Sequence, residues 1–444
     1  MTIHRLFLSL IITGMSIMGG LAESISLPAL HVSGNQLQDA EGHNVTLHGV
    51  MDTPNPYFNG YRWGNKCEVS TATACINYFD KLFTAITDHS KGTYCTVFRL
   101  HLDPCWTNNG TATGENDISK FSPNRLRIYL NRLYAPIMVK ALSHGLYVVV
   151  RPPGVCPKTI QVGDDYQKYL LQVWDSVTNN AVVMAHQGQI MFELANEPVT
   201  VKDAQGVENS NVSLHDFFQP IVDLIRKKGY TGVIWVPGYG YQSQYGPYSV
   251  NPITGDNIGY AVHVYPGWYG TYNTSFTKEA FYQQFLNQVP VQKTNPIIVT
   301  EIDWSPEKPG AGHYNEFNQW VPANYGTWGT ETTTHFGNPW KYVMDRCGNI
   351  SMTLGGTGEY IDIDKYLSER TITRPFSGTD EACDKAAWEW YKAYYEADRG
   401  TGVHAVFAEN RHDSRCYNLL GQRINFSSHG IIIRDGKKFI NKLK

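Results

Sequence analysis

The chain has 444 residues, of which 42% are hydrophobic and 17% charged, a balance that excludes an intrinsically disordered protein. Its 37 Lys and Arg residues are matched by 40 Asp and Glu residues, so no basic excess is available to neutralise a nucleic acid. Aromatic residues reach 13%, and their rings suit both a protein core and the C–H faces of sugars. The length fits either about three domains or one large α/β barrel.

The first 22 residues predict a secretory signal peptide, because a basic start is followed by an apolar stretch and by small residues up to Ala22. The alternative is a membrane anchor, but the apolar stretch from Leu6 to Met18 is shorter than the roughly 20 residues that span a bilayer. We therefore expect cleavage near Ala22 and a secreted protein, whether extracellular, periplasmic or held at the cell surface.

A short hairpin is expected next, since His31 to Val45 contains two extended runs around a Glu41-Gly42 turn. Eight apolar runs then alternate with helix-length stretches such as 124–142 and 216–228. This order predicts an α/β fold, a (β/α)8 barrel over roughly 45–400, with its active site at the carboxyl ends of the strands. The expected strands are 45–50, 94–100, 146–151, 189–194, 232–237, 258–264, 296–301 and 350–354.

Two further segments have their own patterns. Residues 303–340 are rich in Gly, Pro, Trp and Tyr, which favours an elaborated loop over the site. Near the end of the chain, Asp435-Gly436 between two apolar runs predicts a β-hairpin. We therefore divide the chain into a signal peptide (1–22), a barrel domain (23–410) and a short C-terminal β segment (411–444).

The cysteines are compatible with an oxidising compartment. Their spacing does not define the pairing, and we expect Cys67 and Cys75 to form a short loop staple. The alternative is that several are simply buried as small apolar residues. No CxxC motif occurs, so we expect no metal site. The eight are Cys67, Cys75, Cys95, Cys105, Cys156, Cys347, Cys383 and Cys416.

A carboxylate follows each of two expected strands. The fourth closes with Phe192-Glu193-Leu194-Ala195-Asn196-Glu197-Pro198, and the seventh with Val299-Thr300-Glu301. Two carboxylates facing each other across a barrel mouth are the minimum equipment for glycoside cleavage, because one protonates the departing oxygen and the other meets the anomeric carbon. Either one alone could instead be a salt-bridged structural residue.

These motifs resemble glycoside hydrolase family 5, of the clan of retaining (β/α)8 glycosidases. The resemblance covers roughly 30–395 and rests on five motifs in the family's order: the opening hairpin with Leu47-His48-Gly49-Val50, then Phe98-Arg99-Leu100, Asn196-Glu197-Pro198, His263-Val264-Tyr265 and Glu301. The tail after Tyr417 is similar to terminal segments of secreted Bacteroidetes proteins, which implies export; an ordinary terminal hairpin is the alternative.

The resemblance assigns roles residue by residue. It implies that Glu197 is the acid/base and Glu301 the nucleophile, with Arg99 and Tyr265 keeping Glu301 ionised. It also implies that Asn196 binds the sugar 2-hydroxyl and that His263 lies near the acid/base. Structural alternatives are an ion pair for Arg99, packing at the barrel mouth for Tyr265 and a core position for His263.

The sequence departs from the family at two strand ends. The third strand ends in Arg151 rather than a histidine, and the eighth, ending in Gly355-Gly356, lacks the usual tryptophan under the reacting sugar. Candidate replacements or neighbouring sugar platforms are Trp304, Trp268, Trp106, Trp328 and Tyr239, each with packing as its alternative.

The leading hypothesis is a secreted, monomeric endo-β-1,4-glucanase that uses no cofactor and binds a β-linked polysaccharide or oligosaccharide. A β-mannanase, a xyloglucanase and a side-chain-removing glycosidase share the same mechanism. A carbohydrate-binding barrel without activity is the alternative from another class, and the presence of both carboxylates disfavours it.

Overall fold

A computed structural model describes residues 27–109, 117–271, 276–302, 312–314, 318–322, 336–375 and 383–399, together with four short strands near the C-terminus. The predicted signal peptide and most of segment 303–340 lie outside these residues. The chain divides into two compact units, Met1–Arg399 and Gly400–Lys444. None of the described helices is long and apolar enough to cross a membrane.

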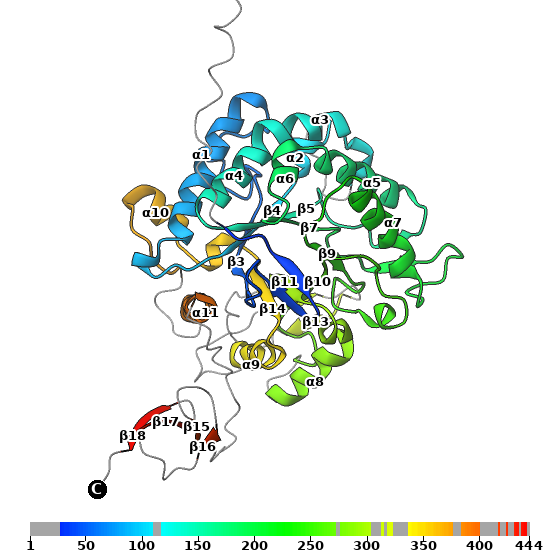
Figure 1. The fold of residues 1–444 in the computed structure, drawn as a ribbon. Coiled ribbons are helices and arrows are strands. Elements are labelled where there is room, and N and C mark those ends of the chain that lie inside the picture. The colour runs from blue at the N-terminus through cyan, green and yellow to red at the C-terminus, as the bar shows by residue number, and fades with distance from the viewer. Residues whose placement is uncertain are drawn as a thin grey trace, which may run out of the picture. The chain divides into compact units, whose positions relative to one another are not determined.

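The first unit is a closed barrel of eight parallel strands, which confirms the predicted (β/α)8 fold (Figure 1). Each predicted apolar run overlaps one of them, and β14 closes the ring against β3. In chain order the barrel strands are β3 (His48–Asp52), β4 (Val97–His101), β5 (Tyr147–Arg151), β7 (Ile190–Glu193), β9 (Ile234–Pro237), β10 (Ile258–Val264), β11 (Ile297–Ile302) and β14 (Ile350–Leu354).

Helices surround this ring of strands (Figure 1). The α-helices are α1 (Val69–Ile86), α2 (Pro104–Thr107), α3 (Pro123–Tyr129), α4 (Ala135–Ser143), α5 (Asp165–Thr178), α6 (Ala181–Ala185), α7 (Ser213–Lys227), α8 (Lys278–Gln288), α9 (Gly337–Cys347), α10 (Ile363–Glu369) and α11 (Cys383–Arg399). A π-helical turn, Leu130–Tyr134, joins α3 to α4. Short 3₁₀ turns are His89–Lys91, Ile118–Lys120, Gly246–Ser249, Pro290–Lys293 and Thr357–Glu359.

The remaining strands form small separate sheets. The expected N-terminal hairpin is present as β1 (His31–Ser33) and β2 (Gln36–Gln38). β6 (Thr159–Gln161) pairs with β8 (Thr200–Lys202), and β12 (Gly312–Tyr314) with β13 (Trp320–Pro322). In the second unit, the predicted antiparallel pair is β17 (Gly430–Arg434) with β18 (Lys437–Asn441), in a sheet with β15 (Cys416–Tyr417) and β16 (Arg423–Ile424).

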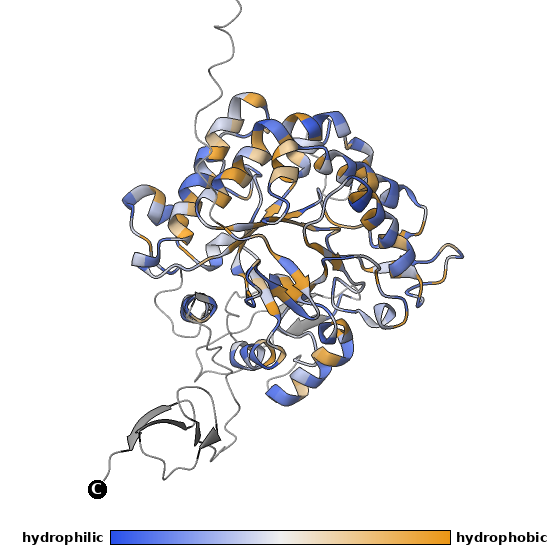
Figure 2. Cartoon of the chain, in the orientation of Figure 1, coloured by the Kyte–Doolittle hydropathy of each residue, from blue (hydrophilic) through white to orange (hydrophobic). Residues whose placement is uncertain are grey.

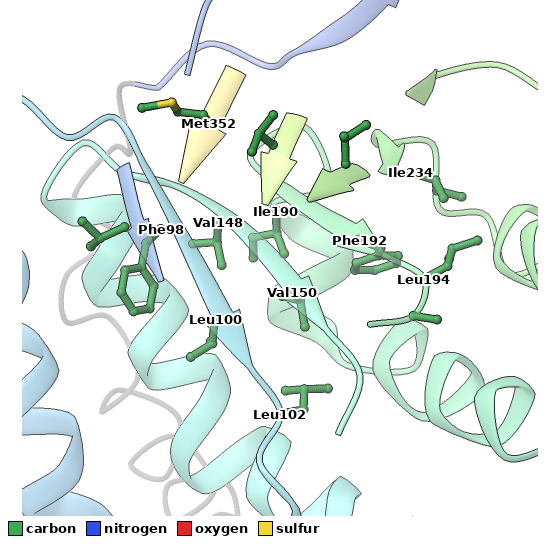
Figure 3. Packing of buried hydrophobic residues seen from close by; sticks show 14 of the residues in the cluster. Phe98, Leu100, Leu102, Val148, Val150, Ile190, Phe192, Leu194, Ile234 and Met352 are labelled. Atoms are coloured by element: carbon green, nitrogen blue, oxygen red, sulfur yellow. The ribbon is translucent and has the colours of Figure 1, made fainter. Parts of the chain in front are cut away.

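Strand residues alternate between two cores, as the period of two requires. Along β4, Phe98 and Leu100 pack outward against the helices, as Figure 3 shows. Val97 points inward to a second cluster, which fills the barrel floor together with Leu30 and Leu37 of the N-terminal region. Figure 2 shows hydrophobic residues concentrated along these strands. Arg99 and His101, which share the inward face with Val97, therefore lie higher in the barrel, toward its carboxyl-end mouth.

The disulfide joins Cys67 to Cys105, so the predicted Cys67–Cys75 pairing is wrong. Cys75 lies one and a half turns into α1, on the face that packs with Phe79 into the core. Cys67 precedes the helix and lies beside the loop after β4. Cys75, Cys95 and Cys156 are buried with free thiols.

Candidate active site

Glu301 stands at the end of β11, directly after a break in the strand register. Val262 of β10 pairs with Val299, but the next residue, His263, pairs with Glu301, so Thr300 is an extra residue in β11. A bulge of this kind re-aims the side chain that follows it. It brings Glu301 to the side chains of β10 and leaves the Thr300 hydroxyl to donate to Glu193, 2.7 Å away.

The Glu301 carboxylate is held by donors on both oxygens. Arg99 Nη1 donates to Oε1 at 3.0 Å, and the Tyr265 hydroxyl donates to Oε2 at 2.8 Å. Burial alone would raise the pKa of this carboxyl, but the positive charges of His263, Arg99 and Arg151 and the Tyr265 hydrogen bond lower it to about 2. Glu301 is therefore an ionised, partly accessible carboxylate across the neutral pH range.

Glu197 follows β7 on a strained turn. Its backbone φ is 58°, in the left-handed region that a non-glycine residue rarely adopts. His263 Nδ1 lies 3.0 Å from Glu197 Oε1 and 3.3 Å from Glu301 Oε2, so one ring nitrogen touches both carboxylates. One oxygen of Glu197 and one of Glu301 lie within 4.8 Å of each other. This spacing is close to that of retaining glycosidases and shorter than the roughly 6.5–9.5 Å that separates the carboxyl groups of inverting ones.

Arg99 connects the nucleophile candidate to the strand that carries Glu197. Its guanidinium makes a bidentate pair with Glu193, with Nε–Oε2 at 2.7 Å and Nη2–Oε1 at 3.0 Å. The same Nη2 donates to Asn196 Oδ1 at 2.7 Å. Burial would raise the pKa of the Glu193 carboxyl, yet the Arg99 charge and hydrogen bonds lower it. Arg99, Glu193 and His263 are fully buried, so this network fixes the floor of the site.

Gln242, from the loop after β9, is a site residue that sequence reasoning missed. Its side-chain carbonyl accepts the Glu197 backbone N–H at 2.6 Å, and its amide nitrogen donates to Glu193 Oε1 at 3.2 Å. Its backbone carbonyl accepts from the His263 N–H at 2.9 Å. Nothing in the sequence marks a loop glutamine of this kind. Glu193 was also missed, although it ends the strand that precedes Glu197.

The third strand shows what stands in place of the family's histidine. Arg151 ends β5 and places Nη2 3.1 Å from His101 Nδ1 of the neighbouring strand β4. The Gly154 N–H donates to the other ring nitrogen of His101 at 3.0 Å. Burial, and then the charges of Arg151 and Arg99, hold the pKa of His101 well below its usual range. A neutral histidine and a buried arginine therefore line this side of the mouth.

The aromatic residues that were predicted as sugar platforms differ in how far the structure exposes them. Trp106 is completely buried and packs edge-on against Tyr129, so the expectation that it offers a ring face to a sugar is wrong. Its position in α2 turns the indole into the core beneath the loop, where Nε1 donates to Pro54. Trp268 is half-buried with its ring 4.9 Å from that of Tyr265, and Tyr239 is also half-buried. Trp304 and Trp328 lie outside the described residues.

A cavity of about 500 Å³ lies beside the catalytic candidates, at the mouth of β3, β4, β5 and β14. Met51, which lines it, receives a contact from Arg99 Nη1 at 2.7 Å, and Gly355, which also lines it, donates its N–H to Ile302 at 3.2 Å. Its other linings include Asp52, Phe58, Asn59, Arg151 and Thr357. The volume suits a small organic ligand.

Glu197, His263 and Glu301 have donor atoms close enough together to hold a metal ion. Both oxygens of Glu301 already accept hydrogen bonds, and the candidate nitrogen of His263 touches both carboxylates. The chemistry that the three side chains support without a metal is proton transfer and nucleophilic attack.

A family model described as cellulase (glycosyl hydrolase family 5) matches residues 64–334, more than half of the chain. No curated protein sequence matches. Among solved structures, the chain is similar to a β-glucanase of Saccharophagus degradans in complex with cellotetraose, with a TM-score of 0.53, 16% identity and coverage of 84% of this chain and 95% of the other. It is also similar to a protein from Cytophaga hutchinsonii, with a TM-score of 0.53, 15% identity and coverage of 83% and 95%. At these identities the likeness shows a shared fold.

Proposed function

The chain belongs to glycosyl hydrolase family 5, and from that premise we propose that it is a secreted, monomeric endo-β-1,4-glucanase that retains the anomeric configuration. Family membership implies glycoside hydrolase activity. The observation that carries the rest is the pair formed by Glu197 and Glu301, whose nearest oxygens lie within 4.8 Å. Retaining enzymes hold their carboxyl groups about 5–5.5 Å apart, because one of them attacks the sugar directly, whereas inverting enzymes leave space for a water.

In the first step Glu301 is the nucleophile. Its ionised carboxylate attacks the anomeric carbon while the bond from that carbon to the leaving oxygen breaks. Glu197 gives its proton to the leaving oxygen, so the departing sugar is released as a neutral alcohol. Arg99 and Tyr265 keep Glu301 ionised and oriented before the attack. The product of this step is a covalent glycosyl-enzyme ester on Glu301.

In the second step Glu197, now a carboxylate, takes a proton from water. The water oxygen attacks the anomeric carbon and the ester bond to Glu301 breaks, which restores both carboxyl groups to their starting state. His263 touches both Glu197 and Glu301, so it remains next to the negative charge whichever group carries it. Asn196 lies beside them on the Arg99 guanidinium, in a position suited to the 2-hydroxyl of the reacting sugar.

Two observations support a glucan as the substrate. The β-glucanase with the similar fold was crystallised with cellotetraose, a β-linked glucose oligomer. The cavity beside Arg99 is lined by two aspartates and two arginines, whose charges balance, and by neutral hydrogen-bonding groups such as Thr53 and Thr357, a lining without net charge that suits an uncharged sugar. A mannanase, a xyloglucanase or a side-chain-removing glycosidase would use the same two steps. Secretion is supported by the signal-peptide pattern of residues 1–22.

The test is an assay of the purified protein on β-glucan, mannan, xyloglucan and aryl β-glycosides, with Glu197 and Glu301 replaced in turn. Glu301→Ala should lose nearly all turnover on every substrate. Glu197→Ala should be least impaired with an activated aryl leaving group, and added azide should restore its second step. Azide rescue of the Glu301 variant with inverted product would reverse the roles. Wild-type activity in both variants, or no activity of the wild type on any glycoside, would refute the proposal.

A further inference from the structure

The loop between β3 and α1 has an unusual distribution of side chains. Tyr57, Phe58 and Tyr61 are 69%, 60% and 53% exposed, whereas the amide of Asn59, between them in sequence, is buried. Polar side chains normally face water and aromatic ones normally pack inward, so the loop is inverted. We call Tyr57, Phe58 and Tyr61 the aromatic platform.

Specific contacts fix this inverted arrangement. Asn59 Nδ2 donates to Asp52 Oδ1 and to the backbone carbonyls of Thr53 and Asn55, at 2.8–3.2 Å. Asp103, on the neighbouring loop, accepts from Thr53 Oγ1 at 2.9 Å and from Asn55 Nδ2 at 3.0 Å. The loop is therefore anchored by its polar groups, and the outward direction of its rings follows from that anchoring.

The rings also order one another. Tyr57 meets Phe58 edge to face with centroids 5.3 Å apart, and meets Tyr61 in the same way at 6.4 Å. Such edge contacts are favourable between aromatic rings and leave ring faces free. The nearby charge of Arg62 is paired with Asp364 at 2.5 Å, so the ion pair is locally neutral.

The platform is continuous with the active site. Phe58 lines the cavity of about 500 Å³, and Met51 and Arg151 line it as well. Met51 contacts Arg99, and the charge of Arg151 acts on Glu301, so the cavity adjoins the candidate catalytic residues. Glu197, which follows β7, lies on the other side of the barrel mouth from this cavity. Because Glu197 protonates the leaving group, the departing sugars lie on its side. The sugars that stay on the enzyme therefore extend in the opposite direction, over β3 and β14.

We propose that the aromatic platform binds pyranose rings of an uncharged β-glycan on the glycone side of the cleft, beyond the reacting sugar. This proposal rests on the proposed function and adds where the chain runs and which residues hold it. Stacking of sugar C–H faces on the free ring faces supplies the binding, and the fixed loop avoids the entropy loss of ordering a flexible one.

The test compares chain lengths. Tyr57→Ala, Phe58→Ala and Tyr61→Ala should each lower kcat/KM on β-glucan pentamers and hexamers by up to about tenfold, since a ring contact contributes on the order of one tenfold step, and the triple variant should lower it by more than any single one. Activity on a short aryl glycoside should stay within twofold. Ile128→Ala, which removes an exposed apolar side chain from α3, is the control and should leave both rates unchanged.

The position of cleavage gives a second readout. Loss of a glycone contact should move the cleaved bond of a reducing-end-labelled pentamer toward its non-reducing end, giving shorter glycone fragments. An unchanged cleavage pattern together with an unchanged ratio of long to short substrates would overturn the platform proposal while wild-type hydrolysis still upheld the proposed function. A wild type that dimerises, with the triple variant monomeric and equally active, would show that the platform is instead a contact between copies.

A separate observation concerns Gln242. Its side chain is fully buried, its own φ is 58°, and its amide orientation is fixed, because the Glu197 N–H needs an acceptor and Glu193 needs a donor. Its amide nitrogen also lies 3.3 Å from the Ala261 carbonyl. Gln242 therefore joins the strained backbone of Glu197 to the Arg99–Glu193 network and to strand β10.

We infer that Gln242 is a positioning residue that aims the acid/base Glu197 at the leaving oxygen. Removal of its carbonyl frees the Glu197 N–H and lets the left-handed turn relax, which moves the carboxyl group that must deliver the proton. The nucleophile has its own donors, Arg99 and Tyr265, and is less affected.

Leaving-group dependence separates this role from general structural support. In Gln242→Ala, kcat/KM should fall by about a hundredfold on glycosides with poor leaving groups, within the range of general acid catalysis, and far less on activated aryl glycosides. Gln244→Ala, on the same loop and partly exposed, is the matched control. An equal loss on all leaving groups, or no loss, would overturn the inference. If Gln242→Ala does not fold, Gln242→Met, which keeps the length of the side chain and loses the acceptor for the Glu197 N–H, is tested by the same comparison.

Discussion

Arg99 contacts both the strand end that carries Glu301 and the strand end that precedes Glu197. It is fully buried, pairs with Glu193 through two hydrogen bonds and donates to Glu301 and Asn196. The resemblance to glycoside hydrolase family 5 implied its contact with Glu301 through the Phe98-Arg99-Leu100 motif. It did not indicate the pair with Glu193, because the side chain that faces a given neighbour inside a barrel depends on strand tilt and on the bulge at Thr300.

The acid limb of the activity depends on the groups that lower the pKa of Glu301, and the Tyr265 hydrogen bond is one of them. Glu301 must be ionised, and its pKa is lowered to about 2, so its activity is lost only as the pH falls through that value. Tyr265→Phe removes one of the donors that favour the ionised form, so the acid limb of the kcat/KM profile should move to higher pH. The rate on activated substrates should fall by about tenfold or more. Tyr282→Phe, on α8 and away from the barrel mouth, is the control, and an unmoved acid limb in Tyr265→Phe would show that the hydroxyl does not act on Glu301.

Removal of Arg99 tests how much this residue contributes to the free energy of unfolding. Arg99→Met leaves the Glu193 carboxyl buried without its cation, which should cost about 3–5 kcal/mol of unfolding free energy. Arg62→Met removes an ion pair whose partner Asp364 has an 83% exposed side chain, so the cost should stay below about 1 kcal/mol. Urea unfolding of both variants measures the difference, and equal costs would contradict the account of the buried network.

Among the structural elements, the strands were predicted correctly, and the differences between prediction and structure lie outside them, in the connecting segments. Continuous apolar runs identified all eight barrel strands, because a parallel strand is buried on both faces. The disulfide was mispredicted because sequence proximity favoured Cys75, whereas the helix turns that thiol into the core. The exposed rings of the loop after β3 were missed because only the folded loop shows which of its side chains face outward.

The disulfide between Cys67, just before α1, and Cys105 of the short helix α2 should contribute to stability. It closes a loop with a sequence separation of 38 residues, for which the chain-entropy model gives about 3–4 kcal/mol. The double variant Cys67→Ser/Cys105→Ser should lose that much unfolding free energy, and reduction of the wild type should cause a similar loss. The double variant should be insensitive to reductant, whereas Cys95→Ser, at a buried free cysteine, keeps the disulfide and should lose stability on reduction as the wild type does. A double variant as stable as the wild type would contradict the pairing.

At the scale of the whole molecule, the barrel unit ends with α11 and not before it. Tyr391 of α11 donates to the Gly49 carbonyl of β3 at 2.8 Å, and Asp398 accepts the Thr46 N–H at 2.9 Å. Trp390 and Tyr391 are buried. The helix therefore packs on β3, the first barrel strand, whereas residues 400–444 form a unit of their own.

Two truncations follow from this division. A chain ending at Arg399 should keep the melting temperature and the activity of the barrel on soluble oligosaccharides. A chain ending at Pro375 loses α11 and exposes the core around Gly49, so it should melt at least 10 °C lower or fail to fold. Calorimetry of the two chains distinguishes them. An equally large loss in the longer chain would show that the C-terminal unit stabilises the barrel.

In the proposed mechanism Glu301 forms a covalent bond to the sugar, while Glu197 donates a proton in the first step and accepts one in the second. The most direct measurement is mass spectrometry of peptides after reaction with a 2-deoxy-2-fluoro β-glycoside of a good leaving group, which slows the second step and traps the intermediate. The double-displacement mechanism predicts one glycosyl label per chain, on Glu301, with none in Glu301→Gln. A label on Glu197, or turnover of natural substrate with inversion and no label on either carboxylate, would contradict it.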